Sequence, residues 1–450
     1  MVKQSNVRSI ALELLIRIQK EGSFSHLLLS QTIRKERLEE NDERLLTEIV
    51  YGTIERKLTL EYYLQPFLRS PKKVADWVML LLKMSVFQLQ CLDKVPDYAV
   101  LNEAVEIAKQ RGHKGIASFV NGVLRNIQRK GVPNIASIKD PAEKLSIETS
   151  HPKWLIERWI TYYGFEVTKD MCEANVSKKS VSLRVNQLRI SREEMIQKLK
   201  AEGITAISSP HVKDGIIVQK GNILKTTYLQ EGLVTIQDQS SMLACLLLDP
   251  QKEMQVLDAC SAPGGKCTYI GELMKNSGHV HAYDLHKNKI NLVRENAKRL
   301  GLSNIKVGQR DARHLQSIYH SESFDRILID APCSGLGVIR SKPDIKYNKH
   351  AGDIKKLQEV QLDILCHIAP LLKNGGKLVY STCTVEEMEN EEVVRIFLER
   401  NPEYSVDQRF FSEVKEIEDR AHATAYGFQL FPQTIQSDGF FMTRLIKTDE

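Results

Sequence analysis

Two cysteines directly follow predicted strands, at positions where a nucleophilic thiol could act on a bound ligand. Cys383, in "YSTCT", follows a Gly-Gly turn and a short apolar run, and Cys333, in "DAPCSG", follows the run "FDRILID". Both runs are predicted strands, and in an open α/β sheet ligands bind outside the carboxyl ends of the strands. An ionised thiol there can form a covalent intermediate, although a buried structural role is the usual one for a lone cysteine. A zinc site is rejected because the cysteines lack paired C-x-x-C spacing, so no metal is expected.

A glycine-rich turn and two carboxylates follow other predicted strands. "LDACSAPGGK", residues 257–266, fits neither G-x-G-x-x-G nor a P-loop, which disfavours a pyrophosphate cradle. Asp284 ends the next strand, where a carboxylate can accept from both ribose hydroxyls of an adenosine. Asp311 follows the third strand and is placed to contact the adenine. Each could be a turn or a cap, but their recurrence at consecutive strand ends favours a nucleoside-type cofactor site.

The secondary-structure elements predicted to position these residues alternate between strands and helices. From Met254 onward, strand-like and helix-like runs follow each other, ending in the strand-like "GFFMTRLIK" at 439–447. This pattern predicts a parallel, doubly wound α/β sheet.

Upstream of that region the pattern changes twice. Residues 1–130 are predicted to be helical, with apolar residues at three- and four-residue steps in 78–89 and 100–108. A turn region near 131–134 is followed by short β-like runs and a helix at 192–202, which indicate a small α+β module. We therefore predict three domains: an all-α domain over 1–135, an α+β module over 145–235 and an α/β domain over 236–450.

Composition and charge narrow the class of protein. The eight cysteines show no framework spacing, which favours reduced thiols over disulfides. Residues 1–22 are predicted to form an amphipathic helix rather than a signal peptide. The apolar stretch 78–84 is too short to span a bilayer, so a cytosolic protein without membrane association is expected. Residues 1–140 carry 22 Lys and Arg against 16 Asp and Glu, so the whole formal surplus of +6 lies there and suggests a polyanionic partner such as nucleic acid.

Three long motifs carry a resemblance to a known family. "DACSAPGGK", "DAPCSGLGVIRSKPDIKY" and "LVYSTCTVEEMENEEVV" closely resemble the motifs of RNA 5-methylcytosine methyltransferases. The stretch 95–127 is similar to the RNA-binding helical domain of the antitermination factor NusB. Together they resemble the bacterial ribosomal RNA small subunit methyltransferase B family, with a Rossmann-like class I methyltransferase domain.

The resemblance implies a cofactor and a set of residues that hold it. The cofactor is S-adenosylmethionine. The residues implied to bind it are Cys260, Ser261, Ala262, Pro263, Gly264, Gly265, Lys266, Asp284, Asp311 and Asp330.

The resemblance also implies roles for the cysteines. Cytosine carbon-5 is a poor nucleophile, and addition of a thiolate at carbon-6 activates it. The RNA family assigns this attack to the threonine-cysteine motif, hence to Cys383. Cys333 would then assist proton loss and release, and Asp330 would hydrogen-bond the ring edge. DNA cytosine methyltransferases instead use a proline-cysteine nucleophile, which would point to Cys333.

The implied substrate is 16S ribosomal RNA, in a loop or single-stranded region, because extruding a base costs least there. Arg56, Lys57, Arg125, Arg129 and Lys130 are candidates for phosphate contacts. A monomer is expected. Two alternatives remain open: a cytosine-C5 methyltransferase of transfer RNA, and a non-catalytic RNA-binding or ribosome assembly factor.

Overall fold

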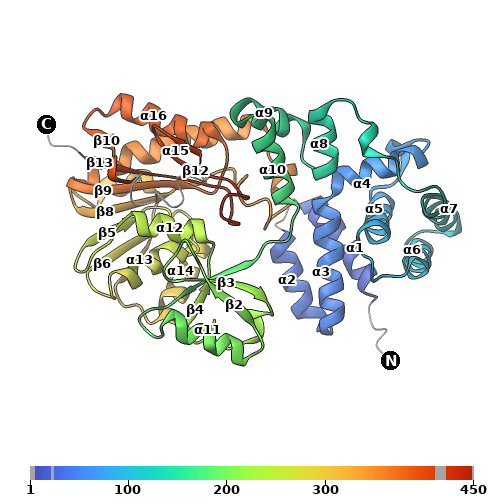
Figure 1. The fold of residues 1–450 in the computed structure, drawn as a ribbon, viewed down its shortest axis with the longest axis horizontal. Coiled ribbons are helices and arrows are strands. Elements are labelled where there is room, and N and C mark those ends of the chain that lie inside the picture. Colours follow the sequence, from blue (N-terminus) through green and yellow to red (C-terminus); the bar gives the residue numbers. More distant parts are fainter. Residues whose placement is uncertain (1–5, 22–24, 411–421, 448–450) are drawn as a thin grey trace. The chain divides into compact units, whose positions relative to one another are not determined.

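The chain forms two units that are not contiguous in sequence. The computed structural model describes residues 6–21, 25–410 and 422–447 (Figure 1). One unit contains 1–177 together with 341–348, and the other contains 178–340 together with 349–450. The segment 341–348, which follows the Cys333 motif in sequence, thus belongs to the helical unit. The three domain boundaries predicted above remain a prediction.

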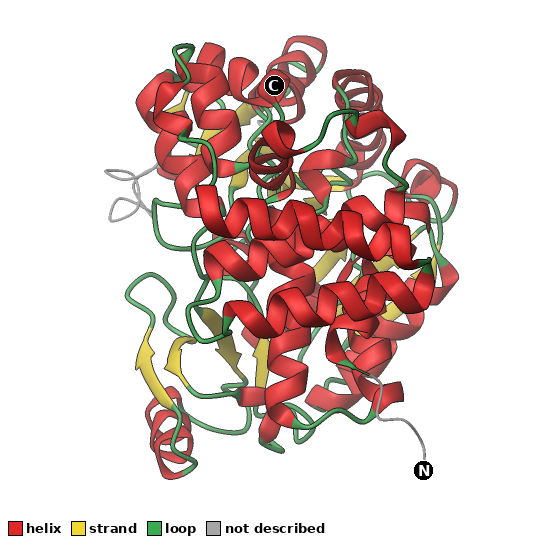
Figure 2. Ribbon diagram, turned by 90° about the vertical axis from the view of Figure 1, so that its right-hand side faces the viewer, coloured by secondary structure: helices red, strands yellow, loops and turns green. Residues whose placement is uncertain are grey.

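The first unit is helical over its described residues, as Figure 2 shows by colour. Its apolar core is built from residues of α1 to α7, and it confirms the helices predicted around 78–89 and 100–108. Within the described residues no helix is long and apolar enough to cross a membrane. Residues 1–5 and 22 of the predicted N-terminal helix lie outside the described ranges. The helices are α1 (Val7–Glu21), α2 (Ser25–Glu36), α3 (Glu40–Glu55), α4 (Lys57–Leu64), α5 (Asp76–Cys91), α6 (Asp97–Arg111), α7 (Lys114–Lys130), α8 (Pro141–Thr149), α9 (Lys153–Tyr163) and α10 (Phe165–Asn175).

The second unit begins with the small α+β module that the sequence predicts. Its antiparallel sheet has the strand order β2-β3-β1-β4, and α11 contacts β2 and β3. Ser191 and Glu194 form a capping box that begins α11. The elements are β1 (Val181–Val185), α11 (Arg192–Ala201), β2 (Thr205–Ser208), β3 (Gly215–Lys220) and β4 (Val234–Ile236).

A larger sheet forms the rest of this unit. Its order is β11-β12-β13-β9-β8-β5-β6-β7, with β10 paired to β13. The predicted parallel part, β9-β8-β5-β6-β7, is confirmed. The C-terminal strand β13 runs antiparallel to β9 and makes the sheet mixed. The bounds are α12 (Gln239–Leu247), β5 (Gln255–Asp258), α13 (Gly265–Leu273), β6 (His279–Asp284), α14 (Lys287–Leu300), β7 (Ile305–Gln309), β8 (Phe324–Asp330), α15 (Ala351–Ile368), β9 (Leu372–Thr382), α16 (Glu391–Arg400), β10 (Tyr404–Val406), β11 (His422–Thr424), β12 (Gly427–Leu430) and β13 (Phe440–Lys447).

Helices cover both faces of this sheet. Figure 1 shows α12, α13 and α14 on one side of the strands, and α15 and α16 on the other. Successive strand residues point to opposite faces of the sheet. Val256 accordingly belongs to one apolar cluster and Leu257 to a separate one. The carboxyl ends of the parallel strands therefore meet at one edge, held rigid by two cores.

Candidate active site

The glycine-rich turn links β5 to α13 at this edge. Gly264 takes φ +106°, a conformation that a side chain would strain, and a Cβ there would lie 3.1 Å from the backbone of Val293. The Ser261 N–H donates to the carbonyl of Tyr283 at 2.7 Å, which ties the turn to the neighbouring strand. The glycine lets the chain turn tightly into the helix, and the loop backbone faces the strand ends.

Carboxylates from adjacent strands converge on this turn. Asp284 ends β6, and its two oxygens accept from the backbone N–H groups of Ala262 at 3.3 Å and His286 at 3.1 Å. Asp311 follows β7 but is held by Arg313 at 2.6 Å, whose hydrogen bond lowers the pKa of Asp311. Asp284 is therefore part of the glycine-turn structure, whereas the Asp311 carboxylate is committed to Arg313.

A cavity of about 180 Å³ lies against the turn. It brings together seven of the ten residues predicted to bind the cofactor, while Gly264, Asp284 and Asp311 do not line it. Its lining is Ile236, Gln237, Ser241, Asp258, Cys260, Ser261, Ala262, Pro263, Gly265, Lys266 and Asp330.

Asp258 is a lining residue that the sequence analysis missed. It ends β5 as Asp284 ends β6, and that shared position is the signal that could have revealed it. Its side chain is fully buried, and neither carboxyl oxygen has a hydrogen-bond partner of good geometry among the described residues, although the backbone N–H of Cys260 is near enough to lower the pKa of Asp258 slightly. Burial, with a smaller effect of the Asp330 charge, raises the pKa of Asp258 to about 8. The buried hydroxyl of Ser261 also has no partner in the part of the chain described. Buried polar atoms without partners are costly, so these atoms fit a site that a polar ligand completes.

The two cysteines lie together at the ends of neighbouring strands. Cys383 follows β9 directly, Cys333 is in the loop after β8, and their sulfur atoms are 3.4 Å apart. The hydrogen bond from Cys333 lowers the pKa of Cys383, against burial, while the same bond and burial raise the pKa of Cys333 well above its usual value. These directions favour Cys383 as the thiol that ionises first, and the Cys333 S–H donates to the resulting thiolate.

Lys266 and Asp330 stand beside this pair. The Lys266 ammonium lies 2.7 Å from one Asp330 oxygen, and the Ser381 hydroxyl donates to the other at 3.0 Å. Burial opposes the charge on Lys266, but the Asp330 carboxylate outweighs it and raises the pKa of Lys266. The Lys266 charge in turn contributes to the lowered pKa of Cys383. The Asp330 charge raises that pKa by a larger effect, so Lys266 partly offsets the carboxylate that lies beside the Cys383 thiol.

A buried carboxylate fixes the loop that carries Cys333. Glu389 accepts from the backbone N–H of Ser334 at 2.8 Å and from the Gln361 amide at 2.9 Å, and that amide also donates to the carbonyl of Pro332. Burial raises the pKa of Glu389, against these hydrogen bonds. The acidic run "EEMENEE" contains this residue, but its spacing does not distinguish Glu389 from the other glutamates of the run, such as the exposed Glu387.

A close backbone approach holds the two cysteine loops together. The Gly337 N–H donates to the carbonyl of Cys383 at 3.0 Å, and the Gly439 N–H donates to the carbonyl of Gly337 at 2.8 Å. A Cβ on Gly337 would collide with the Gly439 backbone. No group of three or more His, Cys, Asp and Glu side chains suited to a metal ion occurs within the described residues.

Comparison with known proteins identifies the family. Residues 245–446 match the 16S rRNA methyltransferase RsmB/F family, residues 5–129 the NusB family, and residues 151–224 the RsmF/B-like ferredoxin-like domain. The chain is 47% identical over 446 residues to the probable ribosomal RNA small subunit methyltransferase B of Bacillus subtilis strain 168, covering 99% of this chain and 100% of the relative. The chain belongs to the ribosomal RNA small subunit methyltransferase B family.

Solved structures agree with this assignment. The structure described as "Crystal Structure of PH0851" superposes with a TM-score of 0.81 at 26% identity, covering 98% of this chain and 99% of that one. A methyltransferase homologue from Pyrococcus horikoshii gives 0.60 at 28% identity, covering 69% and 100%. The predicted architecture, a NusB-like helical domain, a ferredoxin-like module and a methyltransferase domain, is confirmed.

Enzymes of this family depend on S-adenosylmethionine, as predicted. The cavity at the glycine turn suits that cofactor: it presents the unpartnered carboxyl of Asp258 and the hydroxyl of Ser261 to groups that donate hydrogen bonds or carry positive charge. The protein is a methyltransferase whose thiol pair adjoins this cavity through Lys266 and Asp330.

Proposed function

We propose that this enzyme methylates carbon-5 of a cytosine in 16S ribosomal RNA through a covalent adduct with Cys383. The observation that carries the proposal is the thiol pair: the sulfur atoms of Cys383 and Cys333 lie 3.4 Å apart at the ends of neighbouring strands, and the pKa of Cys383 is lowered by the hydrogen bond between them. A purely RNA-binding protein has no need of two thiols at the edge of a cofactor cavity. The rRNA substrate follows from the names of the relatives and from the NusB match.

The residues divide the proposed reaction between them. The Cys383 thiolate bonds to carbon-6 of the base, and the electron pair of the double bond makes carbon-5 nucleophilic. When bound, S-adenosylmethionine supplies an electrophilic methyl group. After carbon-5 is methylated, a base takes its proton, and the electron pair of that carbon–hydrogen bond re-forms the ring double bond as the Cys383–carbon-6 bond breaks, which restores the thiolate. Cys333, 3.4 Å from Cys383, assists this elimination, and Asp330 hydrogen-bonds the ring edge.

The cofactor-binding role is proposed for the turn Cys260–Lys266 and for Asp258, Asp284 and Asp330. Seven lining residues and the unpartnered atoms support it. Asp311 is proposed to act at the rim of the site, because Arg313 already holds its carboxylate.

The experiment is methyl transfer with the purified enzyme. Small-subunit rRNA, transfer RNA and S-adenosylmethionine are incubated with wild type and with Cys383→Ala, and the nucleosides are identified by mass spectrometry. We expect 5-methylcytidine in the small-subunit rRNA with wild type alone. Transfer only to transfer RNA, or methylation at another atom, would contradict the proposal.

A further inference from the structure

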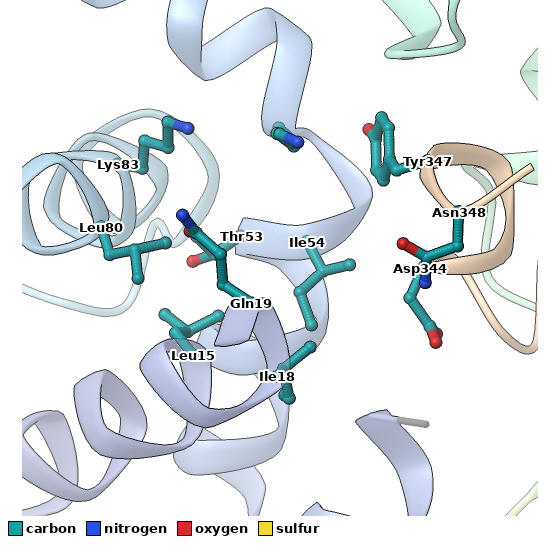
Figure 3. Close-up of a pocket in the computed structure, with 11 residues that line it drawn as sticks. Leu15, Ile18, Gln19, Thr53, Ile54, Leu80, Lys83, Asp344, Tyr347 and Asn348 are labelled. Atoms are coloured by element: carbon teal, nitrogen blue, oxygen red, sulfur yellow. The ribbon is translucent and has the colours of Figure 1, made fainter. Parts of the chain in front are cut away.

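The helical unit contains a second cavity, away from the glycine turn in sequence and built from different elements. It has a volume of about 180 Å³ and lies between α1, α3, α4, α5 and the segment 341–348 (Figure 3). An engineered apolar cavity of about 150 Å³ binds benzene, so this one has room for a single planar ring. Its lining is Leu15, Ile18, Gln19, Thr53, Ile54, Lys57, Leu80, Lys83, Asp344, Tyr347 and Asn348.

The interior is apolar except for two groups with unused hydrogen-bonding capacity. The Thr53 side chain is only 3% exposed, and its hydroxyl oxygen has no partner among the described residues. Figure 3 shows Thr53 beside Leu80, Gln19 and Lys83. The Lys83 side chain is also buried, and its ammonium bonds to Glu61 at 2.6 Å, which leaves donors unused. Apolar walls with a few convergent polar groups are the usual composition of a small-molecule site.

One wall is aromatic and held in place. The Tyr347 hydroxyl is 2.8 Å from the carbonyl of Ser150 and 3.1 Å from that of Glu55, and both accept from it. The preceding residue, Lys346, is completely buried and anchors the segment in the helical unit. The ring is therefore positioned before any ligand arrives, which lowers the entropy that binding would cost.

The mouth of the cavity is positive and polar. Lys57 is exposed there, with its ammonium 5.0 Å from the centroid of the Tyr347 ring. The exposed residues Gln19 and Asn348 also line the cavity. The one carboxylate in the lining, Asp344, already accepts from the Ser25 hydroxyl at 2.8 Å. An aromatic wall inside with a cation at the rim suits a planar ring that carries an anionic group.

We propose that this cavity binds a nucleotide, with the base against Tyr347, Thr53 and Lys83 and the phosphate at Lys57. The nucleotide is either an unpaired residue of an RNA chain or a free nucleotide. The first source rests on the RNA substrate of the proposed function, whereas the binding chemistry is the same for both.

The test measures binding to the full-length protein without cofactor, so it needs no turnover. The probes are UMP, AMP, uridine, inorganic phosphate and a single-stranded hexauridylate, followed by calorimetry and saturation-transfer NMR. We expect saturable binding of UMP or AMP that neither uridine nor phosphate matches. Tighter binding of hexauridylate at the same site assigns the cavity to RNA, and no gain assigns it to free nucleotide.

Thr53→Val is the decisive variant because it keeps the shape and removes only the hydroxyl. Since that hydroxyl has no partner among the described residues, Tm should be unchanged or raised, while nucleotide affinity should fall about two- to tenfold. Lys57→Gln should weaken UMP more than uridine, and the exposed Lys72→Gln on the same unit is the matched control. Absence of saturable binding of both nucleotides, or wild-type affinity in Thr53→Val, overturns the site. A lowered Tm in Thr53→Val also overturns it, because it gives the hydroxyl a structural role.

Discussion

Replacing Asp258 by Asn should make the methyltransferase domain more stable and its cofactor binding weaker. The folded-state pKa of Asp258 is raised from 3.8 to about 8 by burial and by the Asp330 charge. A carboxyl whose folded pKa lies above its unfolded pKa favours folding at low pH. That contribution is fully present below about pH 4 and is lost as the pH rises through about 8. Asn has nearly the same shape and never ionises, so it is free of this loss.

The magnitude follows from the same values. Each pKa unit corresponds to about 1.4 kcal/mol, so the wild type should lose about 4 kcal/mol relative to Asp258→Asn between pH 5 and pH 8. For a domain of this size, 1 kcal/mol changes Tm by about 2–4 °C, so the gap between the two proteins should widen by about 10 °C. The Tm gap between the two proteins is measured by calorimetric melts without cofactor at pH 5 and at pH 8.

A control variant and the result that would contradict the Asp258 prediction both come from the same calorimetric melts. Glu392, half-buried on α16, has its pKa lowered by the Arg395 hydrogen bond, so Glu392→Gln should be less stable than wild type by the same small amount at pH 5 and at pH 8. At pH 8, Asp258→Asn should also bind S-adenosylmethionine at least about tenfold more weakly, because the loop loses its free carboxyl oxygens. A Tm gap that is the same at pH 5 and pH 8 would refute the view that Asp258 is a destabilising, ligand-directed carboxyl.

Three further outcomes follow from the site. Lys266→Met should raise the pKa of Cys383 and move the pH profile of methyl transfer upward, whereas Lys266→Arg should leave the profile near wild type. Glu389→Gln should loosen the Cys333 loop, lower kcat and leave more protein–RNA adduct at steady state, and the exposed Glu387→Gln should not. Asp284→Ala should weaken S-adenosylmethionine binding by at least about tenfold in calorimetry without lowering Tm by more than a few degrees.

Much of the fold could be predicted because strands and helices alternate regularly in the second unit. Strands such as β5 and β8 are short apolar runs between helices with clear periodicity, and their carboxyl ends bear the residues with chemical potential. That geometry placed Cys333 and Cys383 at neighbouring strand ends, and their sulfur atoms are indeed in contact. Local pattern is sufficient there, because the carboxyl ends of parallel strands all lie at the same edge of the sheet.

What the sequence did not predict depends on long-range packing. The segment 341–348 joins the helical unit through the buried Lys346 and the hydrogen bonds of Tyr347, although its neighbours on both sides in sequence belong to the other unit. No local periodicity marks such an exchange. The lack of a well-formed hydrogen bond to the Asp258 carboxyl within the described residues is likewise not predictable from the sequence, because it depends on which donors the fold places beside it.

The division of labour between the thiols can be tested by trapping. Cys333→Ala, Cys383→Ala and wild type are each incubated with small-subunit rRNA and S-adenosylmethionine, and the products are separated on a denaturing gel. Cys333→Ala should accumulate a denaturation-resistant protein–RNA complex, because attack by Cys383 proceeds while release stalls. Cys383→Ala should form no complex and no 5-methylcytidine. A complex that accumulates in Cys383→Ala and is absent from Cys333→Ala would reverse the roles and contradict the assignment of Cys383 as the nucleophile.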